Sequence, residues 1–247
     1  MPQYRLTVEY DGGRFEGWQL QPGQHRTVQG ALHEALLRVT GERARAVGAG
    51  RTDSGVHAAA QVAGVRLTRE VEPGWLRRAL NGVLPADVAI VACERASDEF
   101  HARYDARSKL YHYRIWNGPE RSPLRAACSA WVRSPLDLAA MRAASDCLKG
   151  THDFQSFQAA GSQVKTTVRT LQRVDVQGEA GACVDLFVEG DGFLRHMVRI
   201  VAGTLVQVGL GRRAAQSMPA LLAARDRTRA GGTAAAHALT LVRVDYA

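Results

Sequence analysis

The sequence of 247 residues contains 32 lysines and arginines against 24 acidic residues, which gives a formal charge of +8. Its 46% hydrophobic and 23% charged residues are typical of a folded globular protein and exclude a wholly disordered chain. No apolar run approaches the roughly 18 residues that a membrane-spanning helix needs, and the first residues lack the apolar core of a signal peptide. We therefore expect neither a membrane protein nor an exported one.

Arginine dominates the basic residues, because only three of the 32 are lysines, which leaves 29 arginines. The planar guanidinium group suits bidentate contacts with phosphate and favours a nucleic-acid partner. An ordinary arginine-rich surface explains the composition equally well. The four cysteines are widely separated and lie in apolar stretches, so we expect buried reduced thiols and a cytoplasmic protein. These cysteines are Cys93, Cys128, Cys147 and Cys183.

The first half of the chain alternates predicted strands and helices. Apolar residues at every second position predict a strand over residues 4–10. Thr27 is the predicted N-cap of a helix that ends at Gly41, and a second helix is predicted over residues 73–81. Further strands are expected near residues 60–67, 88–94 and 109–116, the last with Tyr111, Tyr113 and Ile115 on one face.

The second half begins after a turn-rich segment at residues 117–123 and shows the same mixture. Strands joined by hairpins and separated by helices indicate an α+β fold, with helices covering one face of a largely antiparallel sheet. The expected elements are helices over residues 136–148, 193–208 and 214–229, strands over 168–176 and 184–188 that are joined through Gly178 and Gly181, and a closing strand over 239–246.

The segment GAGRTDSGVHA, residues 48–58, has the composition of a site loop. It is not a dinucleotide-binding fingerprint, because Asp53 stands where the third glycine is required. A phosphate-binding P-loop would need Lys and Ser or Thr at the positions of Val56 and His57. A serine nucleophile elbow is excluded because Thr52 and Val56 replace its glycines.

Arg51 and Asp53 are the reactive pair that remains in this loop. A guanidinium group within a few ångströms lowers the pKa of an aspartate by roughly 1–3 units and keeps it ionised. An ionised aspartate can act as a nucleophile or a base. An ion pair that only orders a glycine-rich turn is the alternative.

Two further candidates come from the second half. Tyr111 lies among basic residues, as do aromatic rings that stack on unpaired bases, although a ring on the core face of a strand fits the pattern equally well. Arg199 lies beside the apolar stripe of its helix, where a half-buried guanidinium needs an anionic partner or extends to solvent at the edge of the core. No histidine or cysteine pair has ligand spacing, so we expect no metal.

Several segments together resemble the TruA family of tRNA pseudouridine synthases, in the family's order and over nearly the whole chain. The segments are YDGGRFEGWQLQP (residues 10–22), TVQGALHEAL (27–36), GAGRTDSGVHA (48–58), ALNGVLP (79–85), FHARYDARSKLYHYRIWN (100–117), GTHDFQSF (150–157), GFLRHMVRIVAGTL (192–205) and the closing LTLVRVDY.

The resemblance implies isomerisation of uridine to pseudouridine at positions 38, 39 and 40 of the tRNA anticodon arm, without a cofactor. Asp53 matches the essential aspartate of the family, Tyr111 the tyrosine that packs on the target base, Arg51 the loop arginine that holds the nucleotide out of the stack, and Arg199 the helix arginine that pairs with the aspartate. An RNA-binding module without catalysis, or the same enzyme class acting on another RNA, are the alternatives.

The resemblance also implies a homodimer and two structurally similar halves, whose sheets form one extended mixed sheet with the active-site cleft between the halves. We place the halves at residues 1–104, with the Asp53 loop, and 105–247, with the tyrosine strand and the arginine helix. Four positions depart from the family pattern: Gln158, Ser162, Ala235 and Ala238. The loss of a positive charge at Gln158 bears on any RNA contact there.

Overall fold

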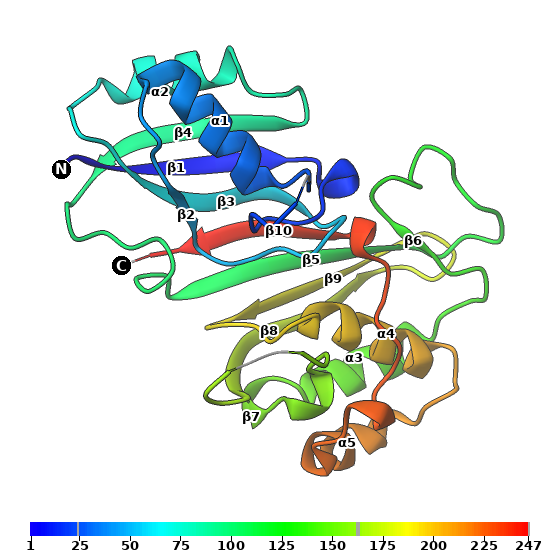
Figure 1. Cartoon of the computed structure of the whole chain (residues 1–247). Coiled ribbons are helices and arrows are strands. Elements are labelled where there is room, and N and C mark those ends of the chain that lie inside the picture. The colour runs from blue at the N-terminus through cyan, green and yellow to red at the C-terminus, as the bar shows by residue number, and fades with distance from the viewer. Residues whose placement is uncertain (24, 162–163, 247) are drawn as a thin grey trace. The chain divides into compact units, whose positions relative to one another are not determined.

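The computed structural model describes residues 1–23, 25–161 and 164–246 (Figure 1). The chain divides into two compact units, of which the first contains Met1–Arg107 and Thr240–Ala247 and the second Ser108–Leu239. Each unit has strands, helices and buried apolar side chains of its own, and all the strands are ordered in one ten-stranded sheet of the described residues. Among the described residues, every helix is too short or too polar to cross a membrane.

The sheet of the first unit is built around β1. This strand runs antiparallel to β3 on one side and to β4 on the other, and β2 also pairs with β3. Tyr4, Leu6, Val8 and Tyr10 of β1 are at most 3% exposed, as their alternation predicts. The strands are β1 (Gln3–Tyr10), β2 (Ala46–Gly48), β3 (His57–Arg66), β4 (Val88–Ala96) and β10 (Leu239–Asp245), which joins β3 in parallel.

Two helices cover one face of this sheet (Figure 1). Helix α1 (Val28–Thr40) begins where the Thr27 hydroxyl accepts a hydrogen bond from the amide of Gly30. It ends at Gly41, whose φ of +75° is the left-handed conformation that glycine adopts without strain. Helix α2 (Pro73–Asn81) begins with proline in its first turn, so both predicted helices are confirmed.

The second unit has the strand order β5-β9-β8-β7, with all three neighbouring pairs antiparallel. Its strands are β5 (Ser108–Trp116), β6 (Ala130–Trp131), which pairs with β5, β7 (Gly150–Asp153), β8 (Val168–Gly178) and β9 (Cys183–Gly190). Gly178 and Gly181, in the hairpin between β8 and β9, both have positive φ. The predicted hairpin is therefore confirmed.

Helices α3 (Leu138–Asp146) and α4 (Met197–Gly209) pack side by side in this unit (Figure 1). Helix α4 begins four residues later than expected, because His196 has a φ of 58°, outside the helical region. The helix expected over residues 214–229 is wrong in extent: α5 covers only Met218–Ala224, and Arg225 ends it with a φ of 50°.

The α+β class with largely antiparallel sheets is confirmed. The unit boundary follows Arg107 instead of residue 104, and Thr240–Ala247 groups with the first unit because β10 pairs with β3. The expected burial of the cysteines is wrong, since Cys128 is exposed and the other three are half-buried; all four are free thiols. Ser162 lies outside the described residues.

Candidate active site

The loop that carries Asp53 connects β2 to β3 and spans residues 49–56, which we call the Asp53 loop. Arg51 is exposed, Thr52 is buried and Asp53 is partly buried. The backbone therefore turns its side chains alternately outward and inward, and the carboxylate retains access to solvent. An ion pair between Arg51 and Asp53 stays a prediction.

Thr52 anchors the loop to the core of the first unit. Its hydroxyl oxygen lies 2.8 Å from the phenol oxygen of Tyr10, and its carbonyl accepts a hydrogen bond of 3.1 Å from the amide of Trp18. Burial raises the pKa of Tyr10 above its usual range, so the phenol keeps its proton at neutral pH. Two bonds on the residue directly before Asp53 fix the position of the loop.

The segment after β1 holds the other side of the Asp53 loop. The Phe15 carbonyl accepts hydrogen bonds from the Gly55 amide and the Ser54 hydroxyl, each 3.2 Å long. Gly17 has a φ of +92°, and a Cβ atom there would lie 2.8 Å from the carbonyl oxygen of Thr52. Only glycine allows this close approach of the two backbones.

Arg26 and Asp87 hold the segment around Phe15 in place. The Arg26 guanidinium lies 4.0 Å from the centre of the Phe15 ring, and its Nη2 atom lies 2.7 and 2.9 Å from the two carboxylate oxygens of Asp87. The hydrogen bond from Arg26 lowers the pKa of Asp87 below its usual range. The Asp53 loop is thus supported by two layers of contacts within the first unit.

The second unit contains Tyr111, on β5, and Arg199, in the first turn of α4. The Tyr111 side chain is buried, and the edge of one ring faces Phe193 with the ring centres 5.1 Å apart. Tyr113 lies two residues on along the same strand face, and burial raises its pKa to about 12 against the opposing effect of the Arg199 guanidinium. The expected shared face of Tyr111, Tyr113 and Ile115 is confirmed, since all three are buried.

Arg199 is half-buried, as its place beside the apolar stripe predicts. Its Nε donates a hydrogen bond of 2.8 Å to the Ala234 carbonyl, and the Ala234 amide donates one of 3.1 Å to the Arg199 carbonyl. Two positions that depart from the family pattern lie just after Ala234: Ala235 is the next residue, and Ala238 ends the short 3-10 helix that follows. Because the guanidinium bonds to the backbone carbonyl of Ala234, this contact does not depend on the side chains at these positions.

Comparison with known proteins identifies the family. A family model described as tRNA pseudouridine synthase matches residues 6–105 and 144–247. The chain belongs to the tRNA pseudouridine synthase family. Arg51, Asp53 and Arg199 lie within the residues that the family model matches, whereas Tyr111 lies in the unmatched stretch between the two ranges.

Relatives named tRNA pseudouridine synthase A align with the entire chain. The protein of Ruminiclostridium cellulolyticum is 42% identical over 246 residues, covering 100% of each chain. That of Pelobacter propionicus is 46% identical, again with 100% of each covered, and that of Myxococcus xanthus is 45% identical, with 92% of the relative covered. The crystal structure of a Cbf5-Nop10-Gar1 complex aligns with 96% of this chain and 48% of that one at 14% identity and a TM-score of 0.39.

The sequence indicates the candidate reactive residues but not the residues whose hydrogen bonds hold the Asp53 loop in place. Tyr10, Phe15 and Trp18 lie in YDGGRFEGWQLQP, where the sequence predicts only that Tyr10 ends a strand on its buried face. A buried tyrosine hydroxyl needs a hydrogen-bond partner, which is the signal in the sequence that points to the contact with Thr52. Phe193, expected within a helix, lies before α4 and packs on Tyr111.

Proposed function

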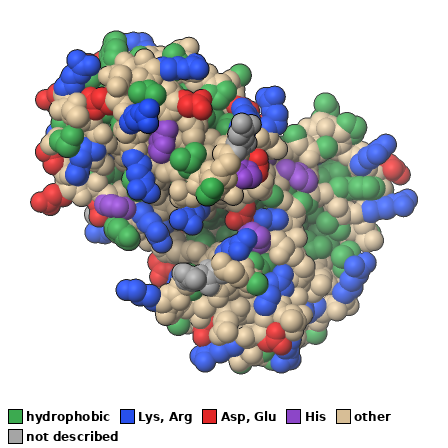
Figure 2. Space-filling model, in the orientation of Figure 1, with side chains coloured by type: hydrophobic (Ala, Val, Ile, Leu, Met, Phe, Trp, Pro, Cys, Tyr) green, Lys and Arg blue, Asp and Glu red, His purple; other side chains and the backbone are tan. Residues whose placement is uncertain are grey.

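We propose that this chain isomerises uridine to pseudouridine in tRNA, at positions 38, 39 and 40 of the anticodon arm, as a cytoplasmic homodimer without a cofactor. Full-length relatives at 42–46% identity that are named tRNA pseudouridine synthase A support the reaction class. Basic side chains are spread over the visible surface of each unit (Figure 2), in keeping with a polyanionic substrate. The positions and the dimer come from the family resemblance.

Asp53 is the proposed nucleophile. The supporting observation is that the Asp53 loop is held from both sides, through Thr52 and through Ser54 and Gly55, while Asp53 itself stays partly exposed. A nucleophile fixed by its neighbours but open to a ligand loses little freedom on reaching the transition state. The carboxylate would attack either the uracil ring or the anomeric carbon of the ribose.

Three residues are proposed to bind the extruded uridine. Arg51, exposed beside the nucleophile, would hold the nucleotide out of the stack, and the ring of Tyr111 would pack on the base. Arg199 would pair with the carboxylate of Asp53. Extrusion of a base costs a few kcal/mol, which stacking and phosphate contacts offset.

The reaction needs no oxidant or reductant. The glycosidic C–N bond breaks, the base turns, a C–C bond forms between C5 of uracil and the anomeric carbon, and the proton on C5 leaves to water while nitrogen takes up another. Atoms and electrons balance within one nucleoside, so side chains that attack, orient and move protons are sufficient.

The test is release of tritium from unmodified tRNA carrying uridine labelled at C5. We expect turnover by the natural chain without added metal and none by Asp53→Asn or Asp53→Ala, with tRNA binding retained in both. Equal turnover in all three proteins would remove Asp53 from the mechanism. Binding of tRNA by the natural chain without any tritium release would contradict the reaction itself.

Two Tyr111 variants test the role of the ring. Since stacking depends on the aromatic face and not on the hydroxyl, Tyr111→Phe should keep most of the turnover and Tyr111→Ala should lose about 1–3 kcal/mol of transition-state stabilisation. Initial rates with the same labelled tRNA measure both. A larger loss in Tyr111→Phe than in Tyr111→Ala would assign the role to the hydroxyl.

A further inference from the structure

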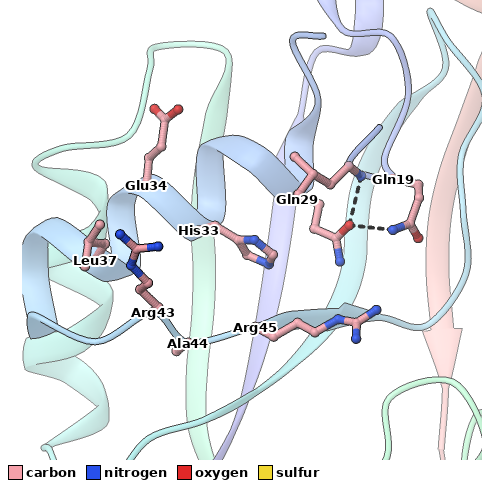
Figure 3. Close-up of a pocket in the computed structure, with 9 residues that line it drawn as sticks. Gln19, Gln29, His33, Glu34, Leu37, Arg43, Ala44 and Arg45 are labelled. Carbon is pink, nitrogen blue, oxygen red and sulfur yellow. Dashed lines mark hydrogen bonds between the residues drawn. The ribbon is translucent and has the colours of Figure 1, made fainter. Parts of the chain in front are cut away.

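A surface pocket of about 480 Å³ lies in the first unit between α1 and the segment that enters β2 (Figure 3). Its volume is within the range of roughly 300–1,000 Å³ that is typical of small-molecule sites. None of the residues proposed for catalysis or uridine binding lines it. The lining residues are Gln19, Leu20, Gln29, His33, Glu34, Leu37, Arg43, Ala44 and Arg45.

Two positively charged side chains in this pocket have no ion-pair or hydrogen-bond partner among the described residues. Arg43 and Arg45 are both exposed, and within the described part of the chain neither side chain makes an ion pair or hydrogen bond. Glu34 is the one carboxylate among the lining residues, and Figure 3 shows that it projects from α1 away from the segment that carries Ala44 and Arg45. The pocket therefore attracts an anion more strongly than the mixed surface around it.

The inner wall of the pocket is fixed in place. Gln29 donates to the Ala46 carbonyl at 2.8 Å and accepts from the Leu20 amide and the Gln19 side chain, each at 2.9 Å. Nε2 of His33 accepts a hydrogen bond of 3.1 Å from the Ala46 amide. Burial, together with the charge of Arg45, lowers the pKa of His33, so the ring is neutral and carries its proton on Nδ1.

Apolar walls complete the pocket. Leu20 is 50% exposed and Leu37 is 42% exposed, and both line it. Apolar side chains beside a few fixed polar groups suit a heterocyclic base, whereas guanidinium groups without an ion-pair partner suit a phosphate. A nucleotide has both parts.

The pocket is connected to the Asp53 loop by a short stretch of chain. Trp18 donates its amide to the carbonyl of Thr52, and Gln19 and Leu20, which line the pocket, are the next two residues. An extended chain advances roughly 3.3–3.6 Å per residue, so Leu20 lies within about 7 Å of Trp18 along the backbone. A polymer that offers one nucleotide to Asp53 can reach the pocket with another.

We propose that this pocket binds one unpaired nucleotide of the tRNA substrate, with the base between Leu20 and Leu37 and the phosphate on Arg43 and Arg45. This inference rests on the proposed function only in its choice of tRNA as ligand. The bound nucleotide is not the one that reacts. It positions the RNA and raises affinity without touching the reacting atoms.

Binding of unmodified tRNA, followed by fluorescence anisotropy, tests the charged part of the site. We expect the double variant Arg43→Ala with Arg45→Ala to raise Kd and KM about tenfold at an unchanged kcat, and to lower the slope of log K against log salt by about 1–2. The control removes two other exposed arginines with the same charge, Arg38→Ala with Arg212→Ala, and should change Kd much less. Equal effects of the two pairs would overturn the proposal.

Leu37→Ala tests the base slot, because it removes one apolar wall of the pocket without a change in charge. We expect Kd to rise about threefold or more, against no change for Leu124→Ala, which removes the same side chain at a leucine that is 94% exposed. If the arginine pair weakens binding but Leu37→Ala does not, the site is a phosphate contact without a base and the proposal is wrong. These Kd comparisons test the proposed pocket even if no tritium is released. If the natural chain does not bind tRNA at all, the proposal that the pocket binds a tRNA nucleotide is refuted.

Discussion

Tyr10 contacts the Asp53 loop through one buried hydroxyl, which lies 2.8 Å from that of Thr52. Tyr10→Phe leaves the Thr52 hydroxyl buried without this partner, which costs about 1–2 kcal/mol of unfolding free energy. Because Thr52 precedes the proposed nucleophile, we also expect kcat to fall at least about tenfold. Urea unfolding and tritium release measure the two effects.

Tyr4→Phe is the matched control for this prediction. Tyr4 lies on the same strand, and its hydroxyl exchanges hydrogen bonds with the amide and carbonyl of Val71 at 2.7 and 2.9 Å, away from the Asp53 loop. It should lose a similar amount of stability and keep its turnover. A parallel fall of kcat in both variants would show that the effect is general loosening of β1 and not displacement of Thr52.

Gly17 shows how closely a second backbone approaches the Asp53 loop. Gly17→Ala strains a residue whose φ is +92° and places a Cβ atom 2.8 Å from the Thr52 carbonyl. Gly41→Ala has the same kind of φ, +75°, with nothing within 4 Å of the new atom. Gly41→Ala should lose about 1–2 kcal/mol of stability from its backbone strain alone, whereas Gly17→Ala should lose more because of the added clash, and only Gly17→Ala should lose turnover. Equal kcat values in the two variants would contradict the proposed role of this contact.

At the scale of elements, the ion pair of Arg26 with Asp87 fixes the segment between β1 and α1 against the turn before β4. Its hydrogen bond lowers the folded-state pKa of Asp87 below the unfolded value of about 3.9. The stabilisation is therefore complete above about pH 4 and is lost as the pH falls through the folded-state pKa. Asp87→Asn should be less stable than the natural chain at pH 6, and the difference should shrink below pH 4.

Urea unfolding across this pH range measures the difference. Asp98→Asn serves as the control, because Asp98 also forms an ion pair, with Arg95 at 2.6 Å, but both side chains are well exposed. Exposed pairs add little to stability, so this variant should follow the natural chain at every pH. A difference that stays constant from pH 6 to pH 2 for Asp87→Asn would exclude the ion pair as its cause.

Most of the elements could be predicted from local patterns. Helix α1 begins at Val28 and ends before Gly41, where its capping residues place it, and the alternation in β1 identified the buried side chains. β2 and β6 were missed because two or three residues carry no periodicity. The start of α4 was missed because the left-handed φ of His196 is set by its surroundings, not by its residue type.

For the candidate site, composition and resemblance pointed to Arg51 and Asp53. The braces could not be predicted, since Tyr10 and Thr52 are 42 residues apart and Arg26 and Asp87 are 61 apart in sequence. Such contacts depend on how distant segments are aligned with each other, and local sequence patterns do not predict that alignment. The pocket at His33 was also missed, because its lining residues come from three separate segments.

At the scale of the whole molecule, the first unit is completed by β10, a strand that follows the second unit in the sequence. Leu241 of β10 is fully buried and pairs with Ala58 of β3. Leu241→Ala should cost about 2–5 kcal/mol and expose the first unit to proteases, although the substitution lies beyond the second unit in sequence. Leu186→Ala, at an equally buried position of β9, should instead expose residues 108–239.

Limited proteolysis with mass spectrometry of the fragments checks both variants. Cleavage confined to residues 108–239 in Leu241→Ala would contradict the assignment of β10 to the first unit. Cleavage of residues 1–107 in that variant, with the second unit intact, is the expected result.

The return of β10 to the first unit also sets an order of events during translation. β10 pairs with His57 and Ala58, the two residues that directly follow the Asp53 loop. While the ribosome makes the second unit, this end of β3 lacks its parallel neighbour and presents unpaired backbone groups. The nascent chain can thus complete the pairing of β3 next to the Asp53 loop only after residues 108–239 have been synthesised.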